Sequence, residues 1–495
     1  MSLAGSHPIL SAAETLAMEE KRFGGQEAAE WRAMQAAGQA VAAAVAGDFT
    51  ERGDFPTEGR ILVVAGKGHN GGDALLAATQ LLETHPRAHA DVLLASGARA
   101  MRPLALRAWQ KLQHAHRDRV RAVTLRSLGE SYAVSLDGLF GFQYRPPLDA
   151  RSLEILRRIN ALAVGLRAAV DLPSGLGAPE AFRADFTYAT GVVKRALLDL
   201  PNAGRLRYLD LGFLADEAMA AVTDRVLTAR VLDPLRAWRD PRADKRGQGN
   251  LFVVAGSRHY PGAALMTVLA ALRSGAGLVT AFVPESLVPA FAAQVPEAIW
   301  VGWPETPEGG LALEGRYLLQ ERLPRATALV IGPGLGREAE TLTLAADIVR
   351  SVPVPVLVDA DALQAPVVAV ARAPLVLTPH AGEFARIAGA RDVRAYATAT
   401  KAIVVLKGPV TRIGAGNEQY HSFFGGPVLA RGGSGDLLAG IVGTQLAQTP
   451  SEPLAAACRG VAWHGLAADA LARAHGATAV RTTQVLDFLG EVLRE

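Results

Sequence analysis

Short apolar runs separated by helical stretches fill the first half of this 495-residue chain. Unbroken apolar runs are typical of strands buried on both faces, and they predict strands at residues 61–65, 91–95, 132–136 and 168–170. Apolar positions at helical spacing predict one or two helices within residues 9–47 and further helices at 74–83 and 104–114. This alternation indicates a mostly parallel, doubly wound sheet, whose ligands lie beyond the carboxyl ends of the strands.

The same alternation returns in the second half. It predicts a helix at residues 265–275 and strands at 250–255, 278–283, 328–331, 354–358, 375–377 and 403–406. Between the halves, residues 214–241 predict a connecting helix and an Arg-, Asp- and Pro-rich linker. We therefore predict an α/β protein of two doubly wound domains, residues 1–222 and 226–495, the first a Rossmann-like three-layer sandwich.

The composition narrows the class of protein. Half of the residues are hydrophobic (50%) and 20% are charged, as in ordinary globular proteins with large cores. The chain has no apolar run of the roughly 20 residues that a membrane span needs, and its N-terminus lacks the order of a signal peptide. A single cysteine, Cys458, excludes an intramolecular disulfide, and the arginines are scattered rather than clustered with aromatic residues. These features predict a cytoplasmic protein without a membrane or nucleic-acid partner.

The stretch with the strongest chemical signal is residues 425–443, GGPVLARGGSGDLLAGIVG. Glycines followed by an apolar helical run indicate a loop that leads into a helix N-terminus, where unpaired N–H groups and the helix dipole bind anions. Asp436 in the first turn is a candidate general base for a hydroxyl that faces a bound phosphate. A plain turn with an aspartate cap explains the same residues, and both interpretations stay open here.

Polar residues follow several strands of the first half. The Gly-rich segment 66–73 follows the first strand, and Asp137, Asp171 and Ser174 follow later ones. Oxygen ligands from several such loops suit a hard cation, including a monovalent one. Each residue could equally be a local turn or cap residue.

Four motifs of the first half, GKGHNGGD, DGLFGFQYRPP, VDLPSG and RYLDLGF, resemble the epimerase domain of the NAD(P)H-hydrate repair enzymes over roughly residues 9–222. The resemblance implies potassium binding by Asn70, Asp137 and Ser174, and acid/base roles for Asp137 and Lys194. It implies hydrate contacts by His69, Asn70, Gly71, Gly72, Asp73, Gly141, Phe142, Gln143, Tyr144, Arg145, Pro146, Pro147 and Asp171.

The first half departs from the family pattern at three places. His69 replaces the first of two asparagines, and Ala74 and Gln143 replace glycines, the latter in a shortened turn. An alternative of a different class is therefore a non-catalytic binding or assembly module.

The motifs GPGLG, DADAL, TPHAGE, LKGPVT and GGSGD resemble the ribokinase-like fold, and within it the ADP/ATP-dependent NAD(P)H-hydrate dehydratases, over residues 226–495. The resemblance implies that Asp436 is the base and that Ala264, Gly334 and His380 contact the hydrate. It implies that Mg²⁺ accompanies the nucleotide and that the nucleotide is bound by Lys407, Gly408, Pro409, Val410, Thr411, Gly432, Gly433, Ser434 and Gly435.

The resemblance implies a nicotinamide-repair enzyme whose partners are small molecules: NADHX, NADPHX and an adenine nucleotide. K⁺ and Mg²⁺ are the expected ions, and a homo-oligomer is the expected assembly. The sequence leaves open whether the co-substrate is ADP or ATP. It also leaves open one alternative for the second half, a small-molecule kinase that releases a stable phosphorylated product.

Overall fold

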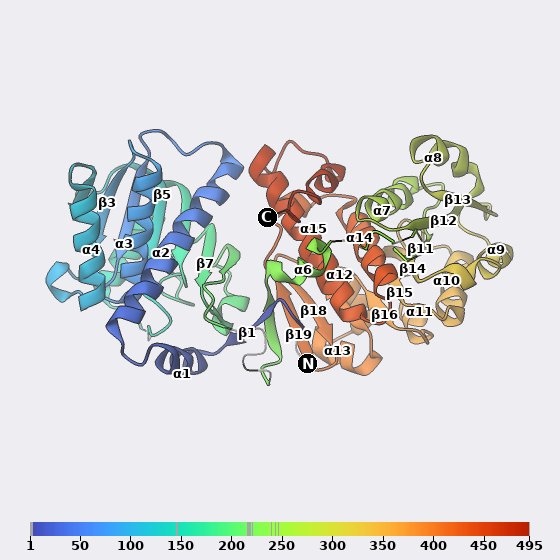
Figure 1. The fold of residues 1–495 in the computed structure, drawn as a ribbon, viewed down its shortest axis with the longest axis horizontal. Helices are drawn as coiled ribbons and strands as arrows, with labels where there is room; N and C mark the ends of the chain where they lie inside the picture. The colour runs from blue at the N-terminus through green and yellow to red at the C-terminus, as the bar shows by residue number, and fades with distance from the viewer. Residues whose placement is uncertain are drawn as a thin grey trace. The chain divides into compact units, whose positions relative to one another are not determined.

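A computed structural model gives the fold and describes residues 3–144, 147–214, 219, 221–238, 240–242, 244–245 and 247–494. The chain forms two compact units (Figure 1). The N-terminal unit is His7–Val222 with Arg473–Gly476, and the C-terminal unit is Met1–Ser6, Thr223–Ala472 and Ala477–Glu495. Within the described ranges, no helix combines the length and the hydropathy that a bilayer span requires.

The N-terminal unit is built on a seven-stranded parallel sheet of order β4-β3-β2-β5-β6-β7-β9. Its strands are β2 (Arg60–Ala65), β3 (His89–Leu94), β4 (Val120–Val123), β5 (Ser131–Gly138), β6 (Ala163–Val170), β7 (Phe186–Thr190) and β9 (Arg205–Leu209). A short parallel pair joins β1 (Ser6–Leu10) to β8 (Val193–Lys194). The strand order reverses between β2 and β5, so a doubly wound sheet places its ligand crevice there.

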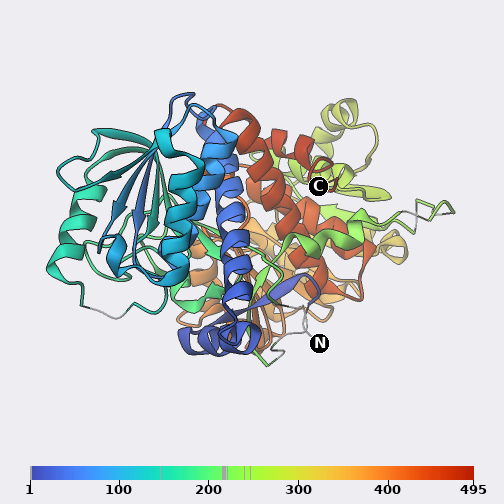
Figure 2. The same ribbon diagram turned by 60° about the vertical axis from the view of Figure 1, so that its left-hand side comes forward.

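Helices cover both faces of this sheet (Figure 2). They are α1 (Ala12–Phe23), α2 (Glu27–Phe49), α3 (His69–Thr84), α4 (Pro103–Ala115) and α5 (Ala150–Asn160). Strand β2 shows why: Ile61 and Val63 pack into the core with α2, α3 and α4, whereas Leu62 and Val64 pack into the core with α5. A strand buried on both faces has no polar face, which is why it appears in the sequence as an unbroken apolar run.

The C-terminal unit holds a second sheet of order β13-β12-β11-β14-β15-β16-β17-β18-β19-β10. Strands β13 to β17 pair in parallel, β17-β18-β19 pair antiparallel, and β10 pairs in parallel with β19. The strands are β10 (Asp224–Leu227), β11 (Asn250–Val254), β12 (Leu278–Pro284), β13 (Ile299–Trp303), β14 (Ala328–Ile331), β15 (Val356–Val358), β16 (Leu375–Leu377), β17 (Ile403–Leu406), β18 (Thr411–Ala415) and β19 (Glu418–Ser422).

Two helical layers enclose this sheet as well. Leu251 and Val253 of β11 share a core with α7, α14 and α15, and Phe252 and Val254 share a core with α10, α12 and α13. The helices of the unit are α6 (Asp233–Arg236), α7 (Pro261–Arg273), α8 (Val288–Gln294), α9 (Arg316–Gln320), α10 (Ala339–Ser351), α11 (Ala365–Ala369), α12 (Ala381–Ala388), α13 (Val393–Thr400), α14 (Ser434–Gln448) and α15 (Pro453–His475). The predicted class, two doubly wound α/β domains, is confirmed.

Three local predictions are wrong. The expected loop at His69–Asp73 is the first turns of α3, and Asp137 lies inside β5 rather than after it. The predicted connecting segment contains β10. The helices predicted within residues 9–47 are α1 and α2. The strands β13, β18 and β19 were not predicted. They form the two flanks of the C-terminal sheet, where Gly302 interrupts the apolar run of β13 and polar side chains interrupt those of β18 and β19.

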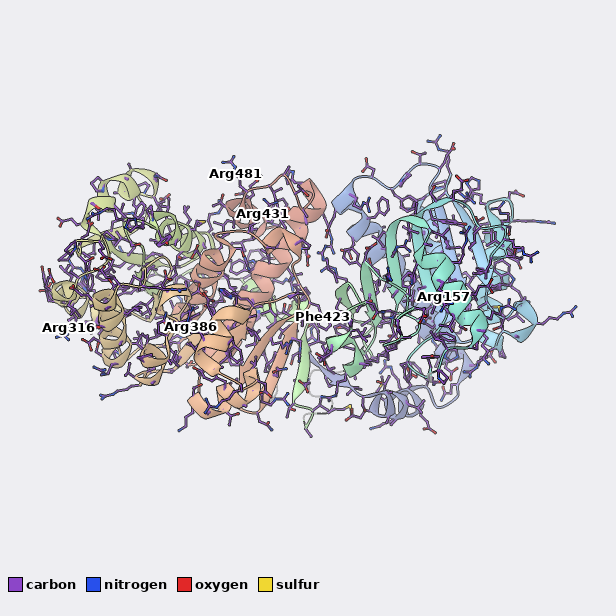
Figure 3. All side chains as sticks on the ribbon, turned by 180° about the vertical axis from the view of Figure 1, so that it is seen from behind. Arg157, Arg316, Arg386, Phe423, Arg431 and Arg481 are labelled. Carbon is purple, nitrogen blue, oxygen red and sulfur yellow. The ribbon has the colours of Figure 1, made fainter. Side chains whose placement is uncertain are left out.

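The arginines labelled in Figure 3 come from separate elements of both units.

Candidate active sites

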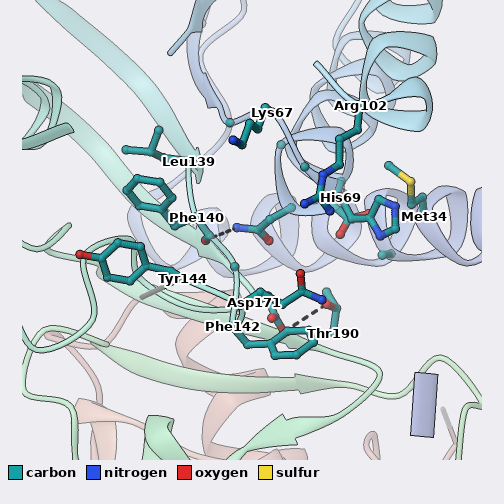
Figure 4. A pocket seen from close by; sticks show the side chains of 18 of the residues that line it. Met34, Lys67, His69, Arg102, Leu139, Phe140, Phe142, Tyr144, Asp171 and Thr190 are labelled. Atoms are coloured by element: carbon teal, nitrogen blue, oxygen red, sulfur yellow. Dashed lines mark hydrogen bonds between the residues drawn. The ribbon is translucent and has the colours of Figure 1, made fainter. Parts of the chain in front are cut away.

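A cavity of about 730 Å³ opens in the N-terminal unit beside the carboxyl ends of its strands. The segments that line it follow β2, β3, β5 and β6, and α1 and α2 contribute further side chains (Figure 4). This is the crevice that the reversal of strand order predicts.

One side of this cavity holds an ion pair and additional carboxyl groups. Lys194 Nζ donates a short hydrogen bond to Asp171 Oδ1 and lies 5.6 Å from the ring centroid of Phe142. Asp171 has a φ of 66°, an unusual conformation for a residue other than glycine, and such strain clusters at functional sites. The Asp73 Oδ1 atom is buried without a hydrogen-bond partner within the described residues.

Two of these carboxyl groups, Asp73 and Glu19, have raised pKa values, so they hold a proton at a higher pH than an exposed carboxyl group does. Burial raises the pKa of Asp73 well above its ordinary value, and the charge of Asp171 raises it further, whereas Lys194 lowers it. Burial likewise raises the pKa of Glu19 on α1 to about 7, although Lys194 opposes the shift. Glu19 can therefore donate or accept a proton near neutral pH.

The three predicted potassium ligands belong to one connected network beside the cavity. Ser174 donates through N and Oγ to the two carboxylate oxygens of Asp137, at 2.7 Å each. The Phe140 N–H donates to Ser174 Oγ at 2.9 Å, and the Asn70 amide donates to the Phe140 carbonyl at 2.6 Å. The Asn70 Oδ1 atom is buried and has no partner in the described part of the chain, so the network fits an oxygen-liganded cation.

Asp137 does not line the cavity. It is 1% exposed, and burial raises its pKa to about 6, although bonds from Ser174 and Leu139 oppose the shift. The titratable groups that line the cavity include Asp171, Lys194, Asp73 and Glu19.

The remaining predicted hydrate contacts lie as follows. His69, Asn70, Gly71, Asp73, Gly141, Phe142, Gln143, Tyr144 and Asp171 line the cavity, and Gly72 and Pro147 do not. Gly72 packs on α2, where an added Cβ would lie 2.0 Å from Met34 Cε. Arg145 and Pro146 lie outside the described residues.

The C-terminal unit places an uncapped helix N-terminus next to an ion pair. The α14 cap is Gly433, with a φ of 89° and no side-chain cap. The Ser434 N–H donates to the Arg431 carbonyl at 3.3 Å, and the N–H groups that follow it in the first turn have no side-chain cap, so an anion can bind them. Lys407 Nζ, at the end of β17, donates to Asp359 Oδ1, at the end of β15, over 3.0 Å. An added Cβ on Gly435 would lie 3.2 Å from Lys407 Nζ, so the predicted nucleotide residues Lys407 and Gly435 are neighbours.

Asp436 on the first turn of α14 faces this ion pair. Burial raises its pKa from 3.8 to about 6, the charges of Asp359 and Asp361 raise it too, and Lys407 lowers it. A carboxylate with this pKa is ionised at neutral pH and is a stronger base than an ordinary aspartate.

The predicted hydrate contacts of this unit lie at two places. Gly334, with a φ of 64°, lies against the start of α7, because an added Cβ would be 2.6 Å from the Tyr260 carbonyl oxygen. Ala264 is buried on α7. His380 caps α12: its Nδ1 accepts from Gly382 N at 3.0 Å, and the side chain is 60% exposed.

The other predicted nucleotide residues surround these groups. Gly408, Pro409 and Val410 follow β17, and Thr411 begins β18. Gly432 and Ser434 flank the α14 cap, and the Gly432 carbonyl accepts from Thr482 Oγ1 at 2.9 Å.

Four side chains of these sites were not predicted: Glu19, Lys67, Arg102 and Tyr260. The first three line the cavity, and Tyr260 is 59% exposed beside Gly334. Only Lys67, inside the Gly-rich segment, carried a signal in the sequence.

Together, these observations define a two-site α/β enzyme, with proton-transfer groups around one cavity and an anion-binding helix with a carboxylate base at the other site. The sequence models of two families match: NAD(P)H-hydrate dehydratase over residues 251–490 and YjeF-related protein N-terminus over residues 31–196.

Similar proteins span nearly the whole chain. A bifunctional NAD(P)H-hydrate repair enzyme Nnr of Gloeobacter violaceus is 36% identical over 479 residues, covering 89% of each chain. One of Moorella thermoacetica is 34% identical, covering 88% of this chain and 87% of the relative. A solved ADP/ATP-dependent NAD(P)H-hydrate dehydratase from Bacillus subtilis, co-crystallised with ATP and Mg²⁺, is 29% identical with a TM-score of 0.44, covering 53% of this chain and 96% of that chain.

This chain belongs to the family of bifunctional NAD(P)H-hydrate repair enzymes. The family predicted from the sequence motifs is thereby confirmed, and the comparisons favour a dehydratase over the kinase alternative.

Proposed function

We propose that this chain repairs hydrated NADH and NADPH in two steps, one in each unit. The N-terminal unit interconverts the R and S hydrates, and the C-terminal unit dehydrates the S hydrate with ADP or ATP as phosphoryl donor. One observation carries the proposal: each unit places a carboxyl group of raised pKa beside an Asp–Lys ion pair at strand ends. Family membership supplies the substrate.

In the C-terminal unit, Asp436 takes the proton of the hydrate hydroxyl as the hydroxyl oxygen attacks the terminal phosphorus of the nucleotide. AMP leaves when ADP is the donor. The N–H groups at the start of α14 stabilise the charge on the transferring phosphoryl group. The carbon–oxygen bond then breaks, phosphate leaves with its electron pair, and the neighbouring carbon gives up a proton to restore the ring double bond.

The nucleotide and its metal ion fit the same place. Lys407 lies within reach of a phosphate near Gly435, and we assign the adenine nucleotide to Lys407–Thr411 and the α14 N-terminus. Within the described residues, no cluster of three or more carboxylate, histidine or cysteine side chains could hold a divalent ion. We therefore expect Mg²⁺ to be held largely by the nucleotide phosphates, whose charge it neutralises.

In the N-terminal unit, the reaction needs a base for the hydroxyl and an acid for the ring nitrogen. Removal of the hydroxyl proton and protonation of the nitrogen break the carbon–nitrogen bond, and reclosure on the opposite face inverts the carbon. Asp171, oriented by Lys194, is our candidate base, and Asp73, which burial keeps protonated, is our candidate acid.

We assign K⁺ to the network of Asn70, Asp137 and Ser174. The buried, unpartnered Asn70 Oδ1 and the buried Asp137 carboxylate give the oxygen donors that a monovalent cation prefers. A bound cation would hold the α3 N-terminus against the segment that follows β5, and so fix one wall of the cavity.

The departures from the family pattern leave this site intact. His69 lies 3.7 Å from Glu30 at the edge of the cavity, and Gln143 is exposed. The Ala74 side chain is fully buried and faces Gly138, which has no side chain to obstruct it. We therefore favour an active epimerase over a non-catalytic module.

The test follows the recovery of reduced-nicotinamide absorbance from a mixture of both hydrate epimers, with ADP, Mg²⁺ and K⁺. Full recovery, faster than spontaneous epimerisation permits, is expected when both units are active. Asp436→Asn should lower the dehydration rate by about 100-fold or more, whereas Asp487→Asn, at an exposed ion pair of the same unit, should leave it unchanged.

A rapid recovery that stalls when one epimer is spent would refute the epimerase assignment and leave the dehydratase. No recovery with either ADP or ATP would refute the repair function of both units. The cytoplasmic location and the homo-oligomeric assembly stay predictions. Sedimentation velocity measures the number of subunits.

A further inference from the structure

The N-terminal sheet has the strand order at which doubly wound proteins bind dinucleotides. From β4 to β7 the order is β4-β3-β2-β5-β6-β7, which is the Rossmann order read from the third strand. In that arrangement the adenosine ribose lies near the end of the second strand, here β3. An acidic residue there binds a free 2′-hydroxyl, whereas a nearby arginine accommodates a 2′-phosphate.

The residues after β3 contain no acid. Ala95 and Ser96 follow the strand and line the cavity, and the next charged residues along the chain are Arg99 and Arg102. Proteins that select dinucleotides with a free 2′-hydroxyl carry a carboxylate at this place. In this chain the same place has only neutral and basic residues.

Two cations line the cavity from this direction. Lys67, in the turn after β2, and Arg102, which precedes α4, are held together because the Arg102 N–H donates to the Lys67 carbonyl at 2.8 Å. Both side chains are exposed, and within the described residues neither forms an ion pair. Figure 4 shows the Arg102 side chain extending towards His69. Burial lowers the pKa of His69, Glu30 opposes this shift, and the charge of Arg102 adds a smaller lowering.

Two of the other charged side chains of the cavity are engaged with a partner. Lys194 pairs with Asp171, and Glu30 lies 3.7 Å from His69. Arg151, at the start of α5, is a further cation of the cavity. Lys67 and Arg102 are the cations that follow β2 and β3, on the side where the adenosine ribose of a dinucleotide lies, and they are available to a phosphate of the substrate there.

We propose that Lys67 and Arg102 form a 2′-phosphate subsite, and that the N-terminal unit therefore prefers NADPH hydrate to NADH hydrate. This inference rests on the proposed epimerase function. The shared pyrophosphate is the other phosphate of the same substrate that these cations could bind, and only binding to the 2′-phosphate discriminates between the two hydrates.

The test measures epimerisation of each hydrate by the full chain, without adenine nucleotide so that dehydration does not interfere. Chromatographic separation of the R and S forms gives kcat/KM for NADPH hydrate and for NADH hydrate. The expected ratio is about tenfold in favour of NADPH hydrate, because a charge-assisted hydrogen bond from an exposed side chain is worth about one power of ten.

The variants are Arg102→Gln and Lys67→Gln, with Arg99→Gln as the matched control. Arg99 is exposed, lies three residues before Arg102 and does not line the cavity. Both cavity variants should raise KM for NADPH hydrate by about tenfold with kcat nearly unchanged, and should leave NADH hydrate unaffected. Arg99→Gln should match the unmodified chain.

Equal kcat/KM values for the two hydrates would overturn the inference while the epimerase function stands. An equal loss for both hydrates in Arg102→Gln would also overturn it, because that result assigns the cations to the pyrophosphate. No turnover of either hydrate would overturn the epimerase function and this inference together.

Discussion

The fall of the dehydration rate at low pH, the acid limb of the pH–rate profile, tests whether Asp436 is the base. Its pKa is raised from 3.8 to about 6, chiefly by burial and next by the charge of Asp359. With a pKa of about 6, about nine-tenths of Asp436 is ionised at pH 7 and about one-tenth at pH 5. Only the ionised form accepts a proton, so the rate should fall almost tenfold over this interval.

Asp359→Asn should move this limb to lower pH. The substitution removes a negative charge that raises the pKa of Asp436, and it frees Lys407, whose charge lowers that pKa. At an effective dielectric constant near 20, charges a few ångströms apart interact by about 1–4 kcal/mol, so a shift of about one pH unit is expected. The amide keeps an oxygen that accepts the hydrogen bond from Thr378 Oγ1, which is 2.8 Å long.

The assay compares initial rates on the S hydrate between about pH 4.5 and pH 8 for the unmodified chain, Asp359→Asn and the exposed control Asp487→Asn. The nucleotide phosphate also titrates near pH 6, but its titration is the same in all three proteins. A limb that stays in place in Asp359→Asn would therefore assign the titration to the nucleotide and refute Asp436 as the group observed. A midpoint near pH 4 in the unmodified chain would refute the raised pKa.

Two further predictions concern the potassium network and a buried histidine. Ser174→Ala removes the hydroxyl that joins Phe140 N to Asp137, so the KCl concentration for half-maximal epimerisation, measured at constant ionic strength, should rise about tenfold; an unchanged KCl dependence would contradict the assignment. Burial lowers the pKa of His464 from 6.5 to about 4, so the unfolded chain binds this proton more tightly. Folding stability present above pH 6.5 should be lost as the pH falls towards 4, by about 3 kcal/mol. Urea unfolding should show a smaller loss in His464→Gln, and an equal loss would contradict the role of His464.

Strands in the middle of each sheet could be predicted from the sequence because both of their faces are buried. The predicted bounds of β14, β16 and β17 are those of the structure, since each is an unbroken apolar run that ends at a glycine, a lysine or a Thr-Pro pair. β18 and β19 could not be predicted in this way. Arg412 is exposed and Gly414 interrupts the run, so the hairpin depends on pairing with β17 rather than on its own pattern.

Some residues of the candidate sites could likewise be predicted from the sequence, and others could not. The rule that ligands lie beyond strand ends brought Asn70, Asp171 and Lys407 into consideration from the sequence alone, because parallel strands end at one edge of a sheet. Glu19 lies on α1, ahead of the sheet, and meets Asp171 and Lys194 only through the tertiary fold. Because these neighbours are distant in the sequence, no local pattern indicates that they lie close together, and this carboxyl group could not be predicted.

The two units share one electrostatic arrangement, an Asp–Lys ion pair with a second aspartate near it, although their folds differ. In each, a lysine neutralises a strand-end aspartate, Lys194 with Asp171 and Lys407 with Asp359. In each, a second aspartate lies near the start of a helix that follows a Gly-rich turn and has no side-chain cap. Because each ion pair carries little net charge, burial dominates the pKa of the second aspartate and raises it in both units. Burial of a carboxyl group beside an ion pair of little net charge is thus enough to raise its pKa in both units.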